Sequence, residues 1–263
     1  MIVGLGEILW DMLPTGRQLG GAPANFAYHA HALGAKSRVA GAVGDDALGR
    51  EIRERLAALG VDAVDLATVP DRPTGTVSVE LDAEGQPAFT IHERVAWDAI
   101  PWSDRLAELA GRTRAVCFGS LAQRAPVSRQ TIERFLCATP AECLRVFDVN
   151  LRQSFYTRSV LDRSLAHAQV CKLNEDELPV VADLLGLGAE QGCALHGLLA
   201  RYDLALVALT RGAAGSVLVT PAERSERRGE AVAVADTVGA GDAFAAAMVC
   251  GWLAGRALDH IHA

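Results

Sequence analysis

Short apolar runs that suit β-strands alternate with helical patterns along most of the 263 residues. Ile2–Leu5 is typical of a buried strand, and Pro23–Leu33 of a helix, with proline in its first turn and Gly34 just past its end. Strands that alternate with helices predict a mainly parallel central sheet covered on both faces, a three-layer α/β fold. The other elements that we expect are Ser37–Val43, a helix that begins after Asp45 and Asp46 and ends at Gly60, Ala115–Phe118, Ser128–Cys137, Arg145–Asp148, Val170–Lys172, Gln191–Arg201 and Leu204–Leu209.

One region interrupts this alternation. Thr74–Glu80 and Ala88–His92 have the pattern of a β-hairpin, with no helix between them. We expect the segment around Asp11–Arg17 to pair with this hairpin. Because no repeat or long linker divides the chain, the sequence predicts a single domain, 1–263, with a small β-sheet lid drawn from about residues 11–19 and 73–93.

Composition and charge narrow the classes of function. The net charge is −7, from 25 basic and 32 acidic residues, and no basic stripe is visible, so nucleic acid and anionic membranes are not expected as partners. No run of about 18 apolar residues and no signal-peptide pattern occurs, which predicts a cytoplasmic protein. The six cysteines form no C-x-x-C pair, and we expect them to be reduced. Only Lys36 and Lys172 are lysines, so phosphate would be neutralised mainly by backbone amides, arginine or a metal.

A glycine-rich string, DTVGAGDAF, occupies residues 236–244 and leads into an apolar helix. Glycine lets backbone amides approach an anion closely, and the start of a helix presents unpaired N–H groups with a partial positive charge. Asp242 lies at this position, where a carboxylate can take a proton from an attacking hydroxyl. For an isolated Gly-Asp pair, a helix cap would explain the residues equally well. The full string favours phosphoryl transfer.

The string resembles the C-terminal signature of the PfkB, or ribokinase-like, carbohydrate kinases, D-T-x-G-A-G-D-x-F. The resemblance implies a ribokinase-like fold and ATP-dependent transfer of the γ-phosphate to a primary hydroxyl of a small sugar. It further implies an anion hole formed by the amides of Gly239, Ala240 and Gly241, with Asp242 as catalytic base. Mg²⁺ would bridge the phosphates of ATP. No G-x-x-x-x-G-K-[ST] string is present, so a P-loop kinase is not expected.

A second glycine pair precedes the first helix and resembles the N-terminal signature of the same family. Gly20 and Gly21 stand before this helix, Asn25 falls in its first turn, and the resemblance continues over residues 41–49. We expect the glycine backbone to touch the sugar and Asn25 to bond one of its hydroxyls. A plain loop followed by a helix start is the alternative. Asp11 follows the first strand, where α/β proteins bind ligands, and the resemblance implies that it bridges sugar hydroxyls.

Asn174 and Glu177 are three residues apart and resemble the N-x-x-E motif of the family, which helps to place Mg²⁺ and phosphate, often through water. The alternative is a capping box, in which Asn174 caps a helix and Glu177 bonds back to it. Both readings can hold together, because capping would orient the pair.

Further candidate contacts follow other expected strands. Arg152 ends a segment that resembles the D-x-N-x-R pattern of the family and is a candidate phosphate or substrate ligand, with a surface ion pair as the alternative. Arg94 follows the lid hairpin and is a candidate sugar contact. Thr210, Gly212 and Gly215 resemble the nucleotide loop of the family, while a simple hairpin turn would also account for them.

The strings around Gly20–Asn25 and Gly6–Asp11 look most like the fructokinase branch, so fructose is the substrate that we expect. Ribokinases usually carry a lysine in the first string, and 2-keto-3-deoxygluconate kinases an aspartate after the two glycines. Neither residue is present at these positions, and ribose and 2-keto-3-deoxygluconate are the alternative substrates. The resemblance also implies a monovalent-cation site for K⁺ with Asp236 and the carbonyl of Val238, and a homodimer formed through the lid.

Family members usually continue some tens of residues beyond the helix that begins near Asp242, so we expect the C-terminal end to be truncated relative to the family. A sugar-binding paralogue with impaired nucleotide binding is therefore an alternative to a kinase, although the intact Asp242 favours catalysis. A third class, a dinucleotide-binding oxidoreductase, has only the weak support of Gly4-Leu5-Gly6, because Leu9 replaces the third glycine of its motif.

Overall fold

The computed structural model describes residues 1–81, 87–230 and 238–262. Within these ranges the strands form one sheet of nine and one of four. The strands are β1 Ile2–Leu5, β2 Leu9–Leu13, β3 Gly16–Gly20, β4 Ser37–Gly44, β5 Leu66–Val69, β6 Gly75–Leu81, β7 Pro87–Ile91, β8 Ala115–Gly119, β9 Leu144–Asp148, β10 Val170–Asn174, β11 Leu206–Thr210, β12 Ser216–Val219 and β13 Arg224–Arg227. The α-helices are α1 Ala22–Ala32, α2 Ala47–Ala58, α3 Asp104–Gly111, α4 Pro126–Ala138, α5 Arg158–His167, α6 Glu177–Leu185, α7 Gln191–Tyr202, α8 Ala240–Leu253 and α9 Leu258–Ile261.

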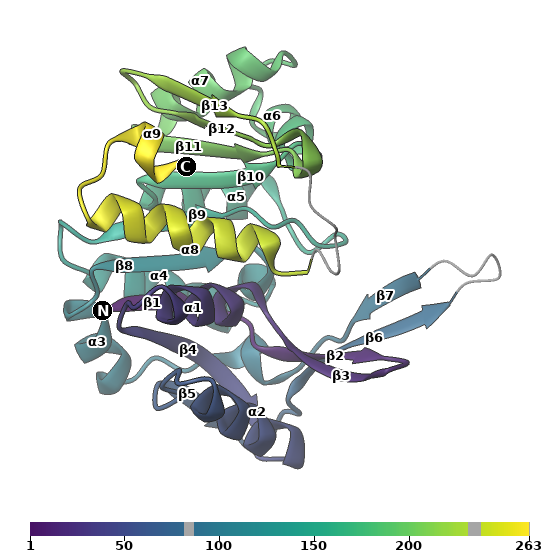
Figure 1. Ribbon diagram of the computed structural model, residues 1–263. Helices are drawn as coiled ribbons and strands as arrows, with labels where there is room; N and C mark the ends of the chain where they lie inside the picture. Colours follow the sequence, from purple (N-terminus) through teal and green to yellow (C-terminus); the bar gives the residue numbers. More distant parts are fainter. Residues whose placement is uncertain (82–86, 231–237, 263) are drawn as a thin grey trace.

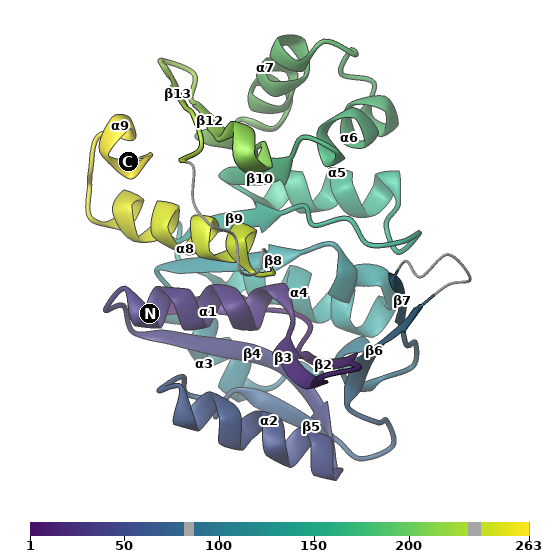
Figure 2. The ribbon, with the colours of Figure 1, turned by 45° about the vertical axis from the view of Figure 1, so that its right-hand side comes forward.

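The large sheet is parallel except at one edge. Its strand order is β13-β12-β11-β10-β9-β8-β1-β4-β5, and only β12 and β13 run antiparallel to their neighbours. Every residue of β1 and β8 is buried, as expected of parallel strands with both faces covered. The sheet, with helices in front of it and behind it, is seen from two sides in Figures 1 and 2. This confirms the predicted α/β fold and its mainly parallel sheet.

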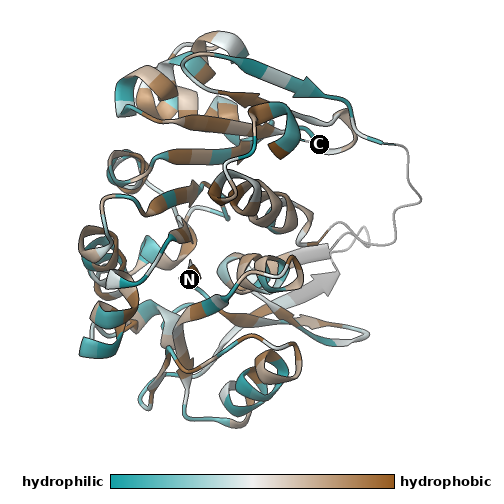
Figure 3. Cartoon of the chain, turned by 60° about the vertical axis from the view of Figure 1, so that its left-hand side comes forward, coloured by the Kyte–Doolittle hydropathy of each residue, from teal (hydrophilic) through white to brown (hydrophobic). Residues whose placement is uncertain are grey.

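Two groups of helices cover the two faces of the large sheet. Buried residues of α1 and α8 pack together against one face. Buried residues of α3, α4, α5, α6 and α7 join the core on the other face. In Figure 3 the central strands are largely brown, while the outer helices carry both brown and teal residues, as this layering requires.

The small sheet is the predicted lid. Its order is β3-β2-β6-β7, in which β2 pairs antiparallel with β3 and parallel with β6. The expected pairing of the segment around Asp11–Arg17 with the later hairpin is therefore confirmed. Figure 1 shows this sheet projecting from the main domain. The turn between β6 and β7 lies outside the described residues.

Asp46 connects the start of α2 to the root of the lid. One of its carboxylate oxygens accepts hydrogen bonds from the amide of Gly49 and the hydroxyl of Thr74, and the other accepts from the amide of Thr74. The hydroxyl of Thr74 in turn accepts from the amide of Gly44. Asp45 was expected to share the cap, but it is exposed and forms an ion pair with Arg50, at 3.7 Å. Asp46 therefore holds together the end of β4, the start of α2 and the segment that leads into β6.

Two other expectations from the sequence can be compared with the fold. All six cysteines are free, as predicted. His262, to which no motif gives a role, packs into the fold. This side chain is 8% exposed and bonds the hydroxyls of Ser216 and Ser225. In the ranges that the structure describes, no helix is long and apolar enough to cross a membrane.

We predict that Asp46→Ala lowers the free energy of unfolding by about 2–3 kcal/mol, because three donors lose one acceptor side chain. Urea denaturation at pH 7 measures this. Asp45→Ala is the matched control and should cost less than about 0.5 kcal/mol, since its ion pair is exposed. Equal losses in the two variants would contradict this role of Asp46.

Candidate active site

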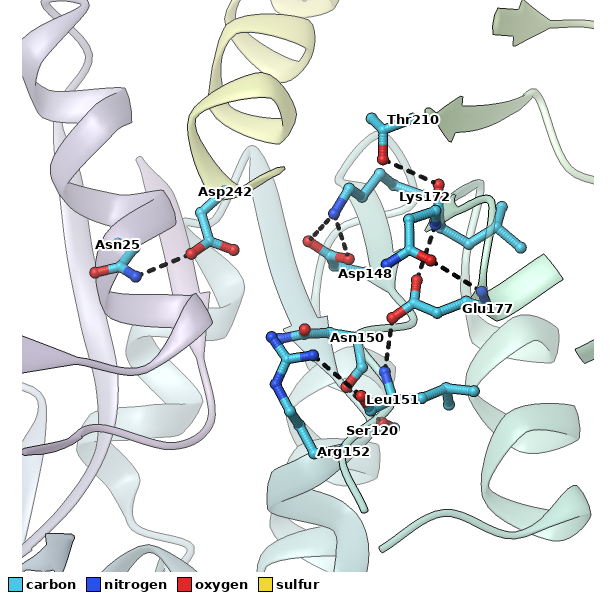
Figure 4. Close-up of polar contacts among 12 residues, drawn as sticks. Asn25, Ser120, Asp148, Asn150, Leu151, Arg152, Lys172, Glu177, Thr210 and Asp242 are labelled. Carbon is cyan, nitrogen blue, oxygen red and sulfur yellow. Dashed lines mark hydrogen bonds and ion pairs between the residues drawn. The ribbon is translucent and has the colours of Figure 1, made fainter. Parts of the chain in front are cut away.

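Asp242 lies in the first turn of α8, beside α1. Gly239 caps α8 with φ of 77°, a left-handed conformation that favours glycine. The side-chain amide of Asn25, on α1, donates to a carboxylate oxygen of Asp242 at 2.9 Å. The two helices run side by side in Figures 1 and 2, and Figure 4 shows the hydrogen bond between them. Residues from the two glycine-rich motifs are therefore brought together from opposite ends of the chain.

The surroundings of Asp242 disfavour its charged form. Burial, and then the nearby negative charge of Asp148, raise the pKa of Asp242 to about 6. The hydrogen bond from Asn25 and the positive charges of Lys172 and Arg152 act in the opposite direction. A carboxylate with a pKa near 6 is ionised at neutral pH and is more basic than an ordinary aspartate, as a general base requires.

A buried ion pair lies beneath the first turn of α8. Lys172 Nζ is 3.0 and 3.2 Å from the two carboxylate oxygens of Asp148, and both side chains are buried. Burial opposes the charge of Lys172, but the carboxylate of Asp148 raises the pKa, so the ammonium group is retained. A Cβ atom on Gly241 would lie 2.8 Å from Nζ. The glycine thus lets the helix start approach the cation closely.

The sequence did not assign roles to either member of this pair. Asp148 was expected only as the first residue of the D-x-N-x-R segment, and Lys172 only as one of two lysines. Their pairing depends on β9 and β10 being neighbours in the sheet. A signal was nevertheless present, because a lysine at the end of an expected buried strand requires a partner.

The glycine pair before α1 makes room for Asp11 and for the turn after β1. A Cβ atom on Gly20 would lie 2.3 Å from a carboxylate oxygen of Asp11. Gly21 has φ of 107°, and its Cβ would lie 2.5 Å from the carbonyl oxygen of Glu7. Burial raises the pKa of Asp11, and the charge of Arg152 opposes this shift. Asp11 is carried by β2 of the lid, whereas Asn25 and Asp242 belong to the main domain.

Glu7 is a further buried carboxyl group near the site. Its side chain is 2% exposed, and within the described part of the chain its Oε2 atom has no hydrogen-bond partner. Burial, together with the charge of Asp242, raises the pKa of Glu7 to about 7. Glu7 stands in the string Gly6–Asp11, and the motifs give it no role of its own. A glutamate directly after a buried strand was the available signal.

Asn174 and Glu177 form the reciprocal contacts of a capping box. The Asn174 side chain accepts from the amide of Glu177, and the Glu177 carboxylate accepts from the amide of Asn174, both at 2.9 Å. The second Glu177 oxygen accepts from the amide of Leu151, at 2.8 Å. The reciprocal bonds of the capping alternative are therefore present, although α6 begins at Glu177 and Asp176, not Asn174, is its N-cap residue. Both oxygens of this carboxylate already bond protein donors, and Figure 4 shows how they join β10 to the loop after β9.

The two candidate arginines differ in their surroundings. Arg152 is exposed and donates to the carbonyl of Leu151, at 3.0 Å, and its charge lowers the pKa of both Asp11 and Asp242. In the ranges that the structure describes, it has no ion pair. Arg94 is exposed, with φ of 58°, after β7. Arg152 therefore lies within electrostatic reach of the site, and the role of Arg94 stays a prediction.

The expected nucleotide loop is the turn between β11 and β12. Thr210 ends β11, and Gly212 and Gly215 have φ of 52° and 96°. The amide of Arg211 donates to the carbonyl of Gly215, at 2.8 Å, which closes the turn. The hairpin alternative is thus confirmed, and contact with a nucleotide remains a prediction. Of the two candidate K⁺ ligands, Asp236 lies outside the described residues, and Val238 is exposed at the start of the α8 turn.

A family model described as pfkB family carbohydrate kinase matches residues 15–262. The chain belongs to the PfkB family of carbohydrate kinases. The fructokinase of Klebsiella pneumoniae is 35% identical over 272 residues, which cover 98% of this chain and 86% of the relative. The family and these relatives identify the chain as an ATP-dependent sugar kinase, so the oxidoreductase alternative is set aside.

Solved structures agree with this fold. An uncharacterized sugar kinase from Pyrococcus horikoshii, in complex with ATP, superimposes with a TM-score of 0.84 at 27% identity and covers 99% of this chain and 87% of its own. A double mutant of the fructokinase from Vibrio cholerae O395, with fructose, ADP and potassium ion bound, gives a TM-score of 0.78 at 27% identity. That match covers 94% of this chain and 81% of the other. The ribokinase-like fold predicted from the motifs is confirmed.

We predict that Lys172→Met lowers the free energy of unfolding by about 3–5 kcal/mol, because it leaves the buried carboxylate of Asp148 without a partner. Adding Asp148→Asn should recover at least half of this loss, since the unpaired charge is then removed. Lys36→Met, at the other and exposed lysine, is the control and should change stability by less than about 0.5 kcal/mol. No recovery in the double variant would argue against an ionised pair.

We predict that Asp242→Asn stabilises the protein at pH 7.5 by about 1–3 kcal/mol. The pKa of Asp242 is raised in the folded protein from 3.8 to about 6. Above pH 6 the ionised carboxylate therefore lowers the free energy of unfolding, and the neutral amide of the variant does not. The difference between variant and wild type should shrink as the pH falls from about 6 to about 4, where the wild-type group is protonated in the folded state. Urea denaturation across this range measures it. A variant less stable than wild type at pH 7.5 would show that the pKa is not raised.

Proposed function

We propose that this protein transfers the γ-phosphate of ATP to a primary hydroxyl of fructose. The observation that carries the proposal is the hydrogen-bonded pair of Asn25 and Asp242 at the glycine-rich start of α8. Fructose is favoured because the relative from Klebsiella pneumoniae is a fructokinase, and because the Vibrio cholerae fructokinase structure holds fructose and ADP. The string Gly20–Asn25 at the start of α1, which resembles the fructokinase branch, supports the same choice.

Asp242 is the proposed base. Its raised pKa suits removal of a proton from the sugar hydroxyl as this attacks the γ-phosphorus. Asp11 and Asn25 are proposed to hold other sugar hydroxyls, with the backbone of Gly20 and Gly21 close to the ring. The half-buried Asp11, carried on the lid, would approach the sugar from the side opposite α8. Arg94 is a proposed lid contact.

The proposed anion hole consists of the amides of Gly239, Ala240 and Gly241. The first turn of a helix presents unpaired N–H groups, and the ammonium of Lys172 lies directly beneath Gly241. Arg152 adds an exposed positive charge that acts on Asp242. These groups would stabilise the negative charge of the phosphoryl group during transfer. The turn at Thr210, Gly212 and Gly215, together with Asn174, is proposed to contact ATP.

Glu177 fits Mg²⁺ only through water. Both of its carboxylate oxygens accept hydrogen bonds from amides, and the described residues contain no group of three acidic, His or Cys side chains that could hold a metal. Mg²⁺ commonly keeps several waters and is held by one or two carboxylates together with phosphates, so this donor set is compatible with it. When bound, Mg²⁺ would neutralise phosphate charge. K⁺ at Asp236 and Val238 remains part of the proposal.

A coupled assay of ADP release tests the substrate, with fructose, ribose, 2-keto-3-deoxygluconate and adenosine compared at equal concentrations. We expect the highest kcat/KM with fructose. A higher kcat/KM with another of these acceptors would identify that compound, and not fructose, as the substrate. Sugar binding without turnover of any of them would instead support a sugar-binding paralogue.

Asp242→Asn should reduce kcat by at least about 10³-fold while the affinity for the sugar changes less than about threefold, because the amide cannot take the proton. For the wild type, kcat/KM should fall about tenfold per pH unit below pH 6, where Asp242 becomes protonated. Isothermal calorimetry and a pH series measure the two effects. Retention of a tenth of the turnover would exclude Asp242 as the base.

A further inference from the structure

Within the described residues, each of the two outer strands of the lid makes one side-chain hydrogen bond to the main domain, in addition to the apolar packing of Leu19 and Ile91. In the described sheet these strands are β3 and β7. On β7, the side-chain amide of Gln153 donates to the carbonyl oxygen of Phe89, at 2.6 Å. On β3, the guanidinium of Arg17 donates to the carboxylate of Glu51, on α2. The lid is therefore held at both edges by residues far apart in the chain.

The root of the lid is held much more firmly. Arg124 bonds both carboxylate oxygens of Asp98, at 2.8 and 2.9 Å, and these two side chains are 7% and 6% exposed. The same guanidinium donates to the carbonyl of His92, just after β7, and stacks on Trp97 and Phe155 at 4.0 and 4.5 Å from their ring centroids. A buried, bidentate and stacked arginine forms a fixed anchor.

The edge contacts are of the opposite kind. Gln153 is exposed and Phe89 is 54% exposed, while the side chains of Arg17 and Glu51 are 44% and 23% exposed. Hydrogen bonds and ion pairs in water contribute little net free energy, because water replaces either partner. Each edge contact can therefore break while the anchor at Arg124 remains.

Lid position determines where Asp11 lies. In the lid, Asp11 on β2 is paired with Val77 of β6, which is in turn paired with Ile91 of β7. Gln153 holds Phe89, two residues before Ile91, and directly follows Arg152 in the loop after β9. The loop after β9 thus carries Arg152, a candidate substrate ligand, and also contacts β7 through Gln153. The same small sheet carries Asp11, a second candidate substrate ligand, on β2.

We propose that Gln153 and the Arg17–Glu51 pair are releasable latches, which hold the lid over Asp242 and so position Asp11 for the sugar. The consequence for catalysis rests on the proposed sugar kinase function, whereas the latching itself does not. Loss of one latch loosens one edge of the lid. Loss of both lets the outer strands move about two fixed points, Arg124 and the buried Trp10 of β2, whose indole donates to the carbonyl of Leu48 at 3.1 Å.

Hydrogen exchange of the lid in the free protein tests the latches without any substrate. Gln153→Glu keeps the shape of the side chain but removes its donor, and Glu51→Gln keeps the shape but removes the charge. We expect each variant to speed amide exchange in peptides from β2 and β6 about threefold, and the double variant about tenfold, because separate sites act independently. Exchange in peptides around Arg124 should stay unchanged.

Matched controls come from exposed residues that form no side-chain hydrogen bond or ion pair within the described residues. These are Gln130→Glu on α4 and Glu54→Gln on α2, and both should exchange like the wild type. Unchanged lid exchange in the double latch variant would overturn the proposal, as would equal acceleration in the controls. These outcomes are independent of which sugar the enzyme uses.

The functional consequence is measured as the ratio of ADP formed to sugar phosphorylated. A lid that opens admits water to the γ-phosphate, so the double variant should hydrolyse ATP without transfer and raise this ratio above one. Its KM for the sugar should rise more than kcat falls. Faster lid exchange with an unchanged ratio and unchanged KM would contradict the positioning of Asp11, while failure to phosphorylate any acceptor would count against the proposed function alone.

Discussion

The hydrogen bond from Asn25 to Asp242 joins two helices that begin 218 residues apart at Ala22 and Ala240. It depends on α1 and α8 covering the same face of the sheet, and on Gly239, whose left-handed conformation caps the start of α8. The bond gives the Asp242 carboxylate a fixed orientation in a place with little water. The charges of Asp148, Lys172 and Arg152 all act on this carboxylate, so their effect on the site depends on where the bond holds it.

Acidic and basic groups near Asp242 have opposite effects on its ionisation. Burial raises the pKa of Glu7 to about 7 and that of Asp242 to about 6, and Asp148 adds a third acidic group. Lys172 is the buried cation that offsets them, and Arg152 adds a second positive charge at the surface. Such a balance leaves Asp242 ionised but basic at neutral pH. It also suits the anion hole that we propose at the amides of α8, where a negatively charged phosphoryl group would lie.

The order of strands and helices could be predicted because each element carries its own periodicity and punctuation, as at Pro23 and Gly34. That Asn25 and Asp242 lie together could be predicted because each stands in a motif with a recognisable family pattern. The pairing of Lys172 with Asp148, and the anchor of Arg124 on Asp98, could not. These contacts depend on which strands are neighbours and on where the lid meets the main domain, and no local pattern encodes either.

The proposed phosphoryl transfer requires Asp242 to face the hydroxyl that accepts the phosphate. A crystal structure with fructose and a non-hydrolysable ATP analogue measures this most directly. We predict a primary hydroxyl of the sugar within about 2.6–3.2 Å of an Asp242 carboxylate oxygen and in line with the γ-phosphorus. A hydroxyl that instead bonds Glu7 or Asp11, with Asp242 more than about 5 Å away, would contradict it.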